Sequence, residues 1–352
     1  MSIEDLKEQF KIAANTEEGK VYKYFPKNLN FFGNKNREII QHAKHSFAFA
    51  RCIGEAFEVC SPEFHRAYQE VTTGEGNEKD KINTIHSSSL LGLLCFYKIS
   101  EDNKLKVTLK VDNEQFVNLV LNKIVFEETN PVFSHSVGLS SIDIALYGND
   151  ADTGENVALF LESKFSEYLH YGKSISNDQA KQYKPFYEFI EKEGGFYDDI
   201  TYEYNDDKGK KVDKKKLIVS SDNHYCEGVK QMISHTIGAI NSVKVENAKI
   251  YLGSILYDFW DNGTNDDTPL SDYKKVYSRL AIALQKLVNE FTDKVDYSRF
   301  FLTKYRNNPK LSEKQNKLFI IKDIISYQQF FDNCNIELDP SVKEYYCLQN
   351  NA

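Results

Sequence analysis

The sequence predicts an α/β protein with a central mixed β-sheet flanked by helices, extended by helical additions at both ends. Three observations predict this fold class. Apolar residues recur at three- and four-residue steps over 36–72, and they alternate with polar residues in much of 104–165. Helical spacing then returns in the last third of the chain. A helical segment, a set of strands and a second helical region are therefore expected in this order.

The chain is long enough for a sizeable core, because 41% of its 352 residues are hydrophobic and 13% are aromatic. We expect a single elaborated domain over 1–352. Its parts are a helical N-terminal segment (1–75), a core (about 80–260) and a mostly helical C-terminal segment (261–352).

The first elements are expected to be helical. Residues 36–72 predict one or two helices, and the polar, glycine-containing segment 72–80 predicts a break after them. Residues 82–99 are expected to begin as a capped helix and to continue into a buried apolar stretch.

Strands follow. Leu105, Val107 and Leu109 alternate with Lys and Thr, which predicts a strand, and a short helix-like piece is expected before a second strand at 124–126. The segments 141–148 and 156–165 are rich in apolar and β-branched residues and are joined by a turn-rich connector, so we expect them to pair as a hairpin.

The rest of the chain alternates between predicted helices and strands. The double glycine after 178–193 suits a helix end, and 206–216 has the composition of a solvated loop. The remaining predictions are a strand at 217–221, a helix at 227–240, a strand at 248–259, a loop at 261–271 and mostly helical segments at 277–291 and 318–331.

Composition excludes several classes of protein. The formal charge of −8 gives no global reason to expect nucleic acid, although a local basic groove and an acidic metal site are compatible with it. Six scattered cysteines without a CxxC pair favour reduced thiols over disulfides or zinc ligands. Phosphate-loop, GxSxG, HExxH and dinucleotide-binding motifs are absent. With no signal-peptide character and no apolar run of roughly 20 residues, we expect a cytoplasmic protein without a membrane span.

The predicted hairpin carries the candidate site. Alternate side chains share a face of a strand, so Glu162 and Lys164 point the same way, and Asp143 lies centrally in the neighbouring apolar strand. The triplet of acid, any residue and Lys occurs elsewhere in the chain, but here it closes an apolar strand next to a second strand with an isolated acid. Two such carboxylates supply the hard oxygen ligands that Mg²⁺ prefers, which predicts a metal-dependent site for phosphate chemistry.

These residues carry a family resemblance. SSIDIALYG followed by VALFLESKFSEY resembles the PD-(D/E)xK nuclease superfamily. Together with EETNPVF and YCEGVKQMISHTIGAI, over roughly 45–260, the chain resembles a bacterial group of predicted restriction endonucleases. The resemblance implies a restriction-endonuclease-like core, catalytic roles for Asp143, Glu162 and Lys164, and metal binding by Asp143, Glu162 and the Ser163 carbonyl. The chain departs from the superfamily pattern in having Ile142, and not proline, before Asp143.

A downstream helix adds two candidates. Gln231 and His235 lie four residues apart and so share one helix face. The pair resembles the Gln-x-x-x-Tyr helix of RecB-like members, with His235 in place of Tyr, which implies a phosphate or water contact. An ordinary polar pair on an amphipathic helix explains the same spacing.

Further acids are left open as metal ligands. Glu127 and Glu128 precede a turn and are more typical of a solvated strand end, while Glu55, Glu58 and Glu70 lie on the predicted opening helices. The sequence does not choose among these five.

The function expected from these residues is a Mg²⁺-dependent DNA endonuclease of a restriction or defence system, with Mn²⁺ able to replace Mg²⁺. The main alternative is an inactive nuclease-fold protein that binds nucleic acid or a protein partner, and a third is a buried structural ion triad. Cleavage of both strands at a palindrome would predict a homodimer. One chain predicts no methyltransferase partner, recognition sequence or choice between endo- and exonuclease action.

Overall fold

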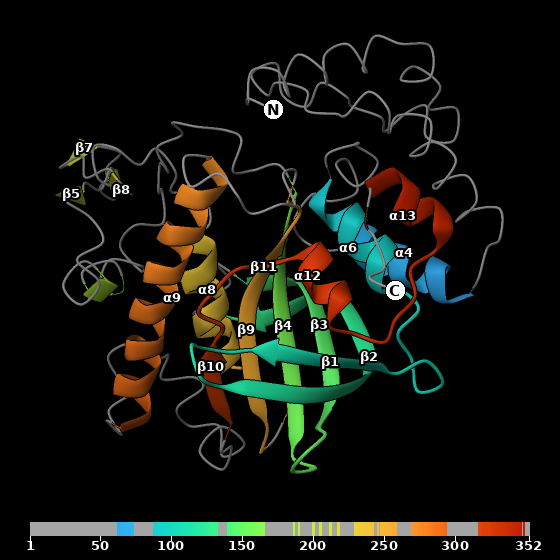
Figure 1. Ribbon diagram of the computed structural model, residues 1–352. Helices are drawn as coiled ribbons and strands as arrows, with labels where there is room; N and C mark the ends of the chain where they lie inside the picture. Colours follow the sequence, from blue (N-terminus) through green and yellow to red (C-terminus); the bar gives the residue numbers. More distant parts are fainter. Residues whose placement is uncertain are drawn as a thin grey trace, which may run out of the picture.

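The computed structural model is a mixed α/β fold around a curled central sheet (Figure 1). The sheet has seven strands, six of which follow the order β1-β2-β3-β4-β9-β10. The seventh, β11, also pairs with β9, farther along that strand than β10. Its strands are β1 (Leu105–Lys110), β2 (Phe116–Pro131), β3 (Leu139–Asp150), β4 (Asn156–Lys164), β9 (Lys249–Leu256), β10 (Lys317–Ile320) and β11 (Ile325–Ser326). The structure describes residues 62–73, 87–132, 139–165, 186, 189–190, 199–200, 204–205, 211–212, 217–218, 229–242, 245, 247–258, 269–293, 316–346 and 348.

Helices cover both faces of the sheet and enclose two hydrophobic cores. One core packs α8 and α9 against the sheet, and the other packs α4, α6, α12 and α13 against the opposite face. The helices are α4 (Pro62–Thr73), α6 (Ser88–Phe96), α8 (Val229–Ile240), α9 (Pro269–Asp293), α12 (Tyr327–Asp332) and α13 (Pro340–Tyr346). The predicted α/β class with flanking helices is confirmed at this level.

The predicted hairpin forms. β3 and β4 pair antiparallel from Asn149↔Asn156 to Ile144↔Leu161, and β4 continues parallel to β9. β4 is buried along nearly its whole length, which explains its unbroken apolar run. Of the predicted capped helix at 82–99, residues 82–86 lie outside the described residues, and the later part is confirmed as α6, whose N-cap Ser87 accepts a hydrogen bond from Leu90 N.

Two local predictions are wrong. No helix-like piece precedes 124–126, because β2 runs unbroken from Phe116 and its residues Val117, Leu119 and Leu121 pair with β1. The segment 318–331 is helical only from Tyr327, since β10 and β11 occupy its first part and pair with β9. The backbone groups of that apolar segment are satisfied by a neighbouring strand, so the C-terminal part adds strands to the sheet as well as helices.

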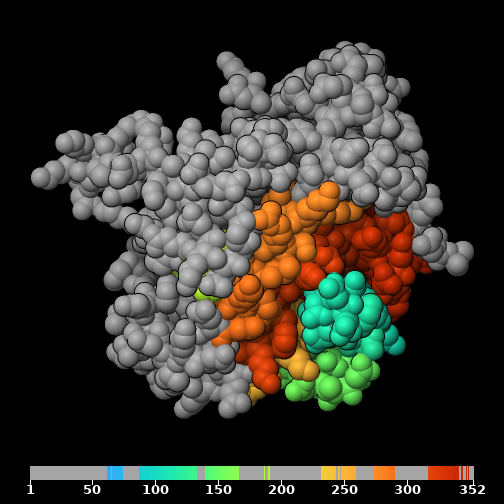
Figure 2. Space-filling view, turned by 60° about the vertical axis from the view of Figure 1, so that its left-hand side comes forward, coloured from blue at the N-terminus to red at the C-terminus, as the bar shows by residue number. Residues whose placement is uncertain are grey.

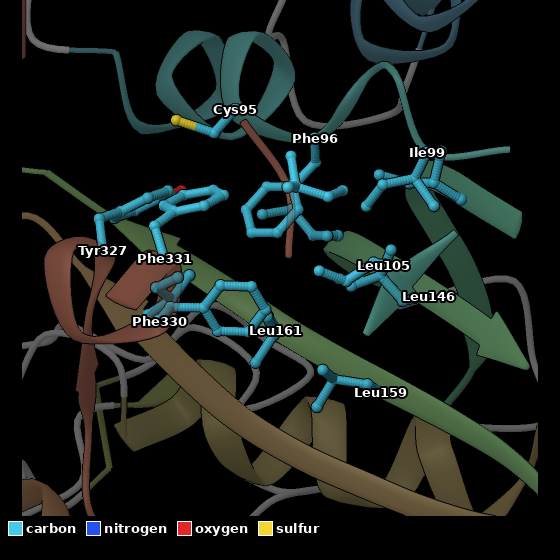
Figure 3. Close-up of a cluster of buried hydrophobic side chains, with 14 of the residues drawn as sticks. Cys95, Phe96, Ile99, Leu105, Leu146, Leu159, Leu161, Tyr327, Phe330 and Phe331 are labelled. Atoms are coloured by element: carbon cyan, nitrogen blue, oxygen red, sulfur yellow. The ribbon is translucent and has the colours of Figure 1, made fainter. Parts of the chain in front are cut away.

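The sheet curls until its first strand reaches the C-terminal segment. Thr108 N donates to Asn333 O, and Lys322 N donates to Val111 O. Figure 3 shows the core inside this curl, where Phe96 from α6 meets Phe330 and Phe331 from α12 above the leucines of β4. None of the helices in the described residues is long and apolar enough to cross a bilayer.

Several predicted elements fall largely outside the described residues. These are the helical segment at 36–61, most of the 206–216 loop and most of the helix at 178–193. Of that last helix, only positions 186 and 189–190 are described, and they are helical. The predicted strand at 217–221 is described as β8 (Leu217–Ile218), which pairs with β5 (Asp199–Ile200), and β6 (Tyr204–Asn205) pairs with β7 (Lys211–Val212).

Candidate active site

The hairpin ladder ends where the candidate acids begin. The last paired residues are Ile144 and Leu161, so Asp143 and Glu162 are the next residues on the two strands. Asp143 Oδ2 instead accepts a hydrogen bond from the backbone N–H of Ser163 at 2.7 Å. The Asp143 carboxylate therefore occupies a position at which a backbone carbonyl would continue the ladder, and this fixes it beside the end of β4.

Near Asp143, the side chains of β2 and β3 switch from one face of the sheet to the other. Phe126 and Ile144 belong to the core under α6, whereas Val132 and Ile142, at positions of the same parity on their strands, belong to the core under α8. Glu127 lies at the change and has a left-handed backbone with φ of 50°. A non-glycine residue in this conformation costs about 1–3 kcal/mol, and such residues cluster at functional sites. Strand alternation alone would not place these side chains.

Glu162 is the centre of a buried charged network on the α8 side. Its Oε1 accepts from Lys164 Nζ at 2.7 Å, and its Oε2 lies 2.8 Å from His235 Nε2. Burial by itself would raise the pKa of the Glu162 carboxyl, but Lys164 and His235 more than offset it and lower the pKa from 4.5 to about 2. Glu162 is thus held ionised, and its side chain is only 2% exposed.

Gln231 and His235 of α8, whose spacing predicts a shared helix face, both contact this network. Gln231 Oε1 accepts from Lys164 Nζ at 2.9 Å. His235 Nδ1 lies 2.6 Å from the hydroxyl of Ser140 on β3. An ionised carboxylate only accepts hydrogen bonds, so the His235 Nε2 must carry the proton shared with Glu162. In the neutral ring, the Ser140 hydroxyl then donates to Nδ1.

His235 is too enclosed for the phosphate or water contact expected from the resemblance. Its side chain is 3% exposed and its two ring nitrogens contact Glu162 and Ser140. The helix lies close to β3 because Gly238 faces it: a Cβ on Gly238 would be 2.8 Å from the Cβ of Ser140. In this geometry His235 orients the Glu162 carboxylate. Gln231 orients the Lys164 ammonium in the same way.

Asp143 is the least compensated group of the cluster. Burial, followed by the charges of Glu162 and Glu127, raises the pKa of its carboxyl well above the ordinary value, against the opposing effects of Lys164 and the Ser163 N–H. It forms no ion pair with any residue in the described ranges. Unlike the buried Glu162, Asp143 is half-buried, so the cluster reaches the surface of the described residues through Asp143 and the half-buried Gln231.

The further candidate acids differ in their burial and in their hydrogen-bond partners. Glu127 and Glu128 are 8% and 3% exposed within β2, so the interpretation as a solvated strand end is wrong. Glu127 Oε2 accepts from the Ser141 hydroxyl at 2.6 Å, and its charge acts on Asp143. Glu70 accepts from Phe126 N at 3.1 Å and so anchors α4 to β2. Glu55 and Glu58 lie outside the described residues.

Sequence reasoning missed Ser140 and the shape of the site. Ser140 sits in an unremarkable Ser-Ser pair, and its contact with His235 depends on how α8 docks, for which the sequence carries no local signal. Two cavities, of 640 and 350 Å³, lie elsewhere and are not lined by Asp143, Glu162 or Lys164. The larger one is bounded by α9, β10 and the β1–β2 turn, which meet on one face in Figure 2.

The side chains of the site that would bind a cation are carboxylates. In the described part of the chain, no group of three or more His, Cys, Asp or Glu side chains has the arrangement of a formed metal site. Asp143 and Glu162 are nevertheless neighbouring carboxylates, and their mutual repulsion contributes to the raised pKa of Asp143. A divalent cation would relieve this repulsion, and carboxylate oxygens are the ligands that such a cation prefers.

Comparisons of the chain with models of known protein families, with curated proteins and with solved structures find no match. The class that the fold and site define is thus an α/β protein with a curled mixed sheet and a charged cluster at the end of its central hairpin.

Proposed function

We propose that this protein is a metal-dependent phosphodiesterase that hydrolyses DNA, with Asp143, Glu162 and Lys164 as its catalytic residues. The observation that carries the proposal is Asp143, a half-buried acid placed next to Glu162 without an ion-pair partner in the described residues. In a purely structural network this acid would cost free energy when ionised, because no cation in the described residues forms an ion pair with it. Acids held in this way are typical of functional sites.

Asp143 and Glu162 would hold Mg²⁺, or Mn²⁺ in its place, with the Ser163 carbonyl as a further oxygen ligand. A bound divalent cation would lower the pKa of a coordinated water and stabilise the charge that develops on phosphate. Among the three candidates that the structure describes, Glu70, Glu127 and Glu128, we propose Glu127 as the additional acid, because its charge acts directly on Asp143.

The protein's own groups then have separate tasks. Lys164 carries the ammonium that neutralises developing charge or orients the attacking water, and the Gln231 amide oxygen fixes the direction of its Nζ. His235 holds the second oxygen of Glu162, and Ser140 holds His235. This support keeps the Glu162 carboxylate in one orientation, as catalytic geometry requires.

We infer that the protein acts in the cytoplasm, in restriction or defence. This role requires that its substrate is DNA that the cell must destroy. A homodimer follows if both strands are cut at a palindrome. The competing function is nucleic-acid binding without cleavage. The net charge of −8 does not distinguish the two functions, so a cleavage assay is needed to separate them.

The test is incubation of the full chain with plasmid DNA and with RNA in Mg²⁺, Mn²⁺ or EDTA. We expect conversion of supercoiled plasmid to nicked or linear forms with either metal and none with EDTA. Strand cleavage that persists in EDTA would contradict the metal dependence. Binding of DNA without cleavage in any metal would favour the non-cutting alternative, and RNA cleavage alone would reassign the substrate.

A further inference from the structure

The side of β4 that faces away from the acids carries a second network. Ser163 lies between Glu162 and Lys164 but points to the opposite face, toward α6 and α12. Its Oγ donates to the backbone carbonyl of Ser88 at 2.9 Å and lies 2.7 Å from the hydroxyl of Tyr327. The residue whose backbone N–H holds Asp143 is therefore itself held from behind.

The direction of these hydrogen bonds follows from their chemistry. A carbonyl oxygen only accepts, so the single Ser163 hydroxyl hydrogen goes to Ser88. Both contacts are satisfied together only if the Tyr327 hydroxyl donates to Ser163 Oγ. Tyr327 thus supplies a hydrogen that neither Ser163 nor Ser88 can provide.

The packing leaves Tyr327 little freedom to move. Its side chain is fully buried, and Figure 3 shows its ring beneath α6 beside Phe331. The two rings stack with centroids 6.4 Å apart. A Cβ on Gly92 of α6 would lie 3.0 Å from Ile144 Cδ1 and 3.5 Å from the Tyr327 hydroxyl oxygen, so α6, β3 and α12 are in close contact here.

We propose that Tyr327 is a positioning residue of the active site, which holds Ser163 so that the Ser163 N–H keeps the Asp143 carboxylate beside Glu162. The role in catalysis rests on the proposed function, whereas the control of Ser163 and Asp143 by Tyr327 does not. It connects the C-terminal segment to the acids through β4, from Tyr327 Oη to Ser163 Oγ and from Ser163 N to Asp143 Oδ2.

The test compares Tyr327→Phe with Tyr257→Phe. Tyr257 belongs to the same core, is also buried, and donates its hydroxyl to the carbonyl of Tyr346 instead of Ser163. Each variant loses one buried hydroxyl and keeps its ring, so their stability costs should be similar. The first readout is hydrogen exchange of the Ser163 amide in ¹⁵N-serine-labelled protein, assigned with Ser163→Ala and compared with global stability. The second is plasmid cleavage at saturating DNA.

In Tyr327→Phe we expect the Ser163 amide to exchange about tenfold faster than in Tyr257→Phe at matched stability, and cleavage to slow by roughly tenfold through misplacement of Asp143. The DNA concentration giving half-maximal rate should not change. Equal amide exchange in the two variants would overturn the proposal, as would equal cleavage rates in an active enzyme. If wild-type protein does not cleave, the nuclease proposal fails, and amide exchange alone still decides whether Tyr327 positions Ser163.

Discussion

Replacing Asp143 with Asn is expected to abolish metal-dependent cleavage while making the folded protein more stable. Asn has no charge for a cation, and removing several kcal/mol of transition-state stabilisation lowers the rate by roughly a thousandfold or more. Its amide oxygen still accepts the Ser163 N–H that Asp143 Oδ2 accepts at 2.7 Å, so the local structure should be kept.

The gain in stability follows from the sign of the pKa shift. The pKa of Asp143 is raised in the folded protein, first by burial and then by Glu162 and Glu127. The folded state therefore binds a proton more tightly than the unfolded state, and stability falls as the pH rises from the ordinary value of 3.8 through the folded pKa. The Asp143→Asn substitution removes this loss, and we expect a gain of about 0.5–2 kcal/mol at neutral pH without added metal.

Asp150 on the same strand provides the matched control. Burial opposes ionisation there too, but the Thr153 and Asp152 N–H groups and Lys249 lower the pKa of its carboxyl. Asp150→Asn should therefore lose stability and keep cleavage activity. Urea unfolding in EDTA, together with plasmid assays, measures both pairs of effects. A destabilised Asp143→Asn protein, or one that still cleaves, would contradict the assignment.

Replacing Glu162 with Gln is expected to have the largest effect on stability. The carboxylate is bonded by Lys164 and His235, and removing one partner of a buried ion pair typically costs about 3–5 kcal/mol. Cleavage should disappear as well, because Glu162 is the second metal ligand of the proposal.

The pH dependence distinguishes this charged network from simple packing. The pKa of Glu162 falls from 4.5 to about 2 on folding, which corresponds to stabilisation on the order of a few kcal/mol at ~1.4 kcal/mol per pKa unit. Because the folded pKa is the lower one, this stability is fully present above pH 4.5 and is lost as the pH falls toward 2. The difference in unfolding free energy between wild type and Glu162→Gln should therefore shrink between pH 7 and pH 3. A constant difference across this range would show that Glu162 is not held as a carboxylate.

The sequence was sufficient to predict the β3–β4 hairpin and the proximity of its two acids. The apolar runs of β3 and β4 specify strands, and the register Ile144↔Leu161 brings Asp143 next to Glu162. The four-residue spacing of Gln231 and His235 likewise put both on the face of α8 that meets Lys164 and Glu162. These features depend on local periodicity, which is visible in one sequence.

Features set by distant contacts were not predictable. A short buried strand and a buried helix look alike in an apolar segment such as the one from Leu318, and only pairing with β9 makes it extended. The left-handed backbone of Glu127 has no sequence signal. The contact of Tyr327 with Ser163 joins residues 164 positions apart, so it emerges only when α12 docks behind β4.

Calorimetric titration of the full chain with Mn²⁺ tests the central claim most directly, because it measures cation binding at Asp143 and Glu162 without requiring the correct DNA. We predict a saturable binding isotherm for wild type and, for the folded Asp143→Asn protein, affinity at least about tenfold lower. Wild-type protein that gives only heat of dilution, or an Asp143→Asn variant that binds Mn²⁺ as tightly as wild type, would contradict the assignment of these acids as a metal site.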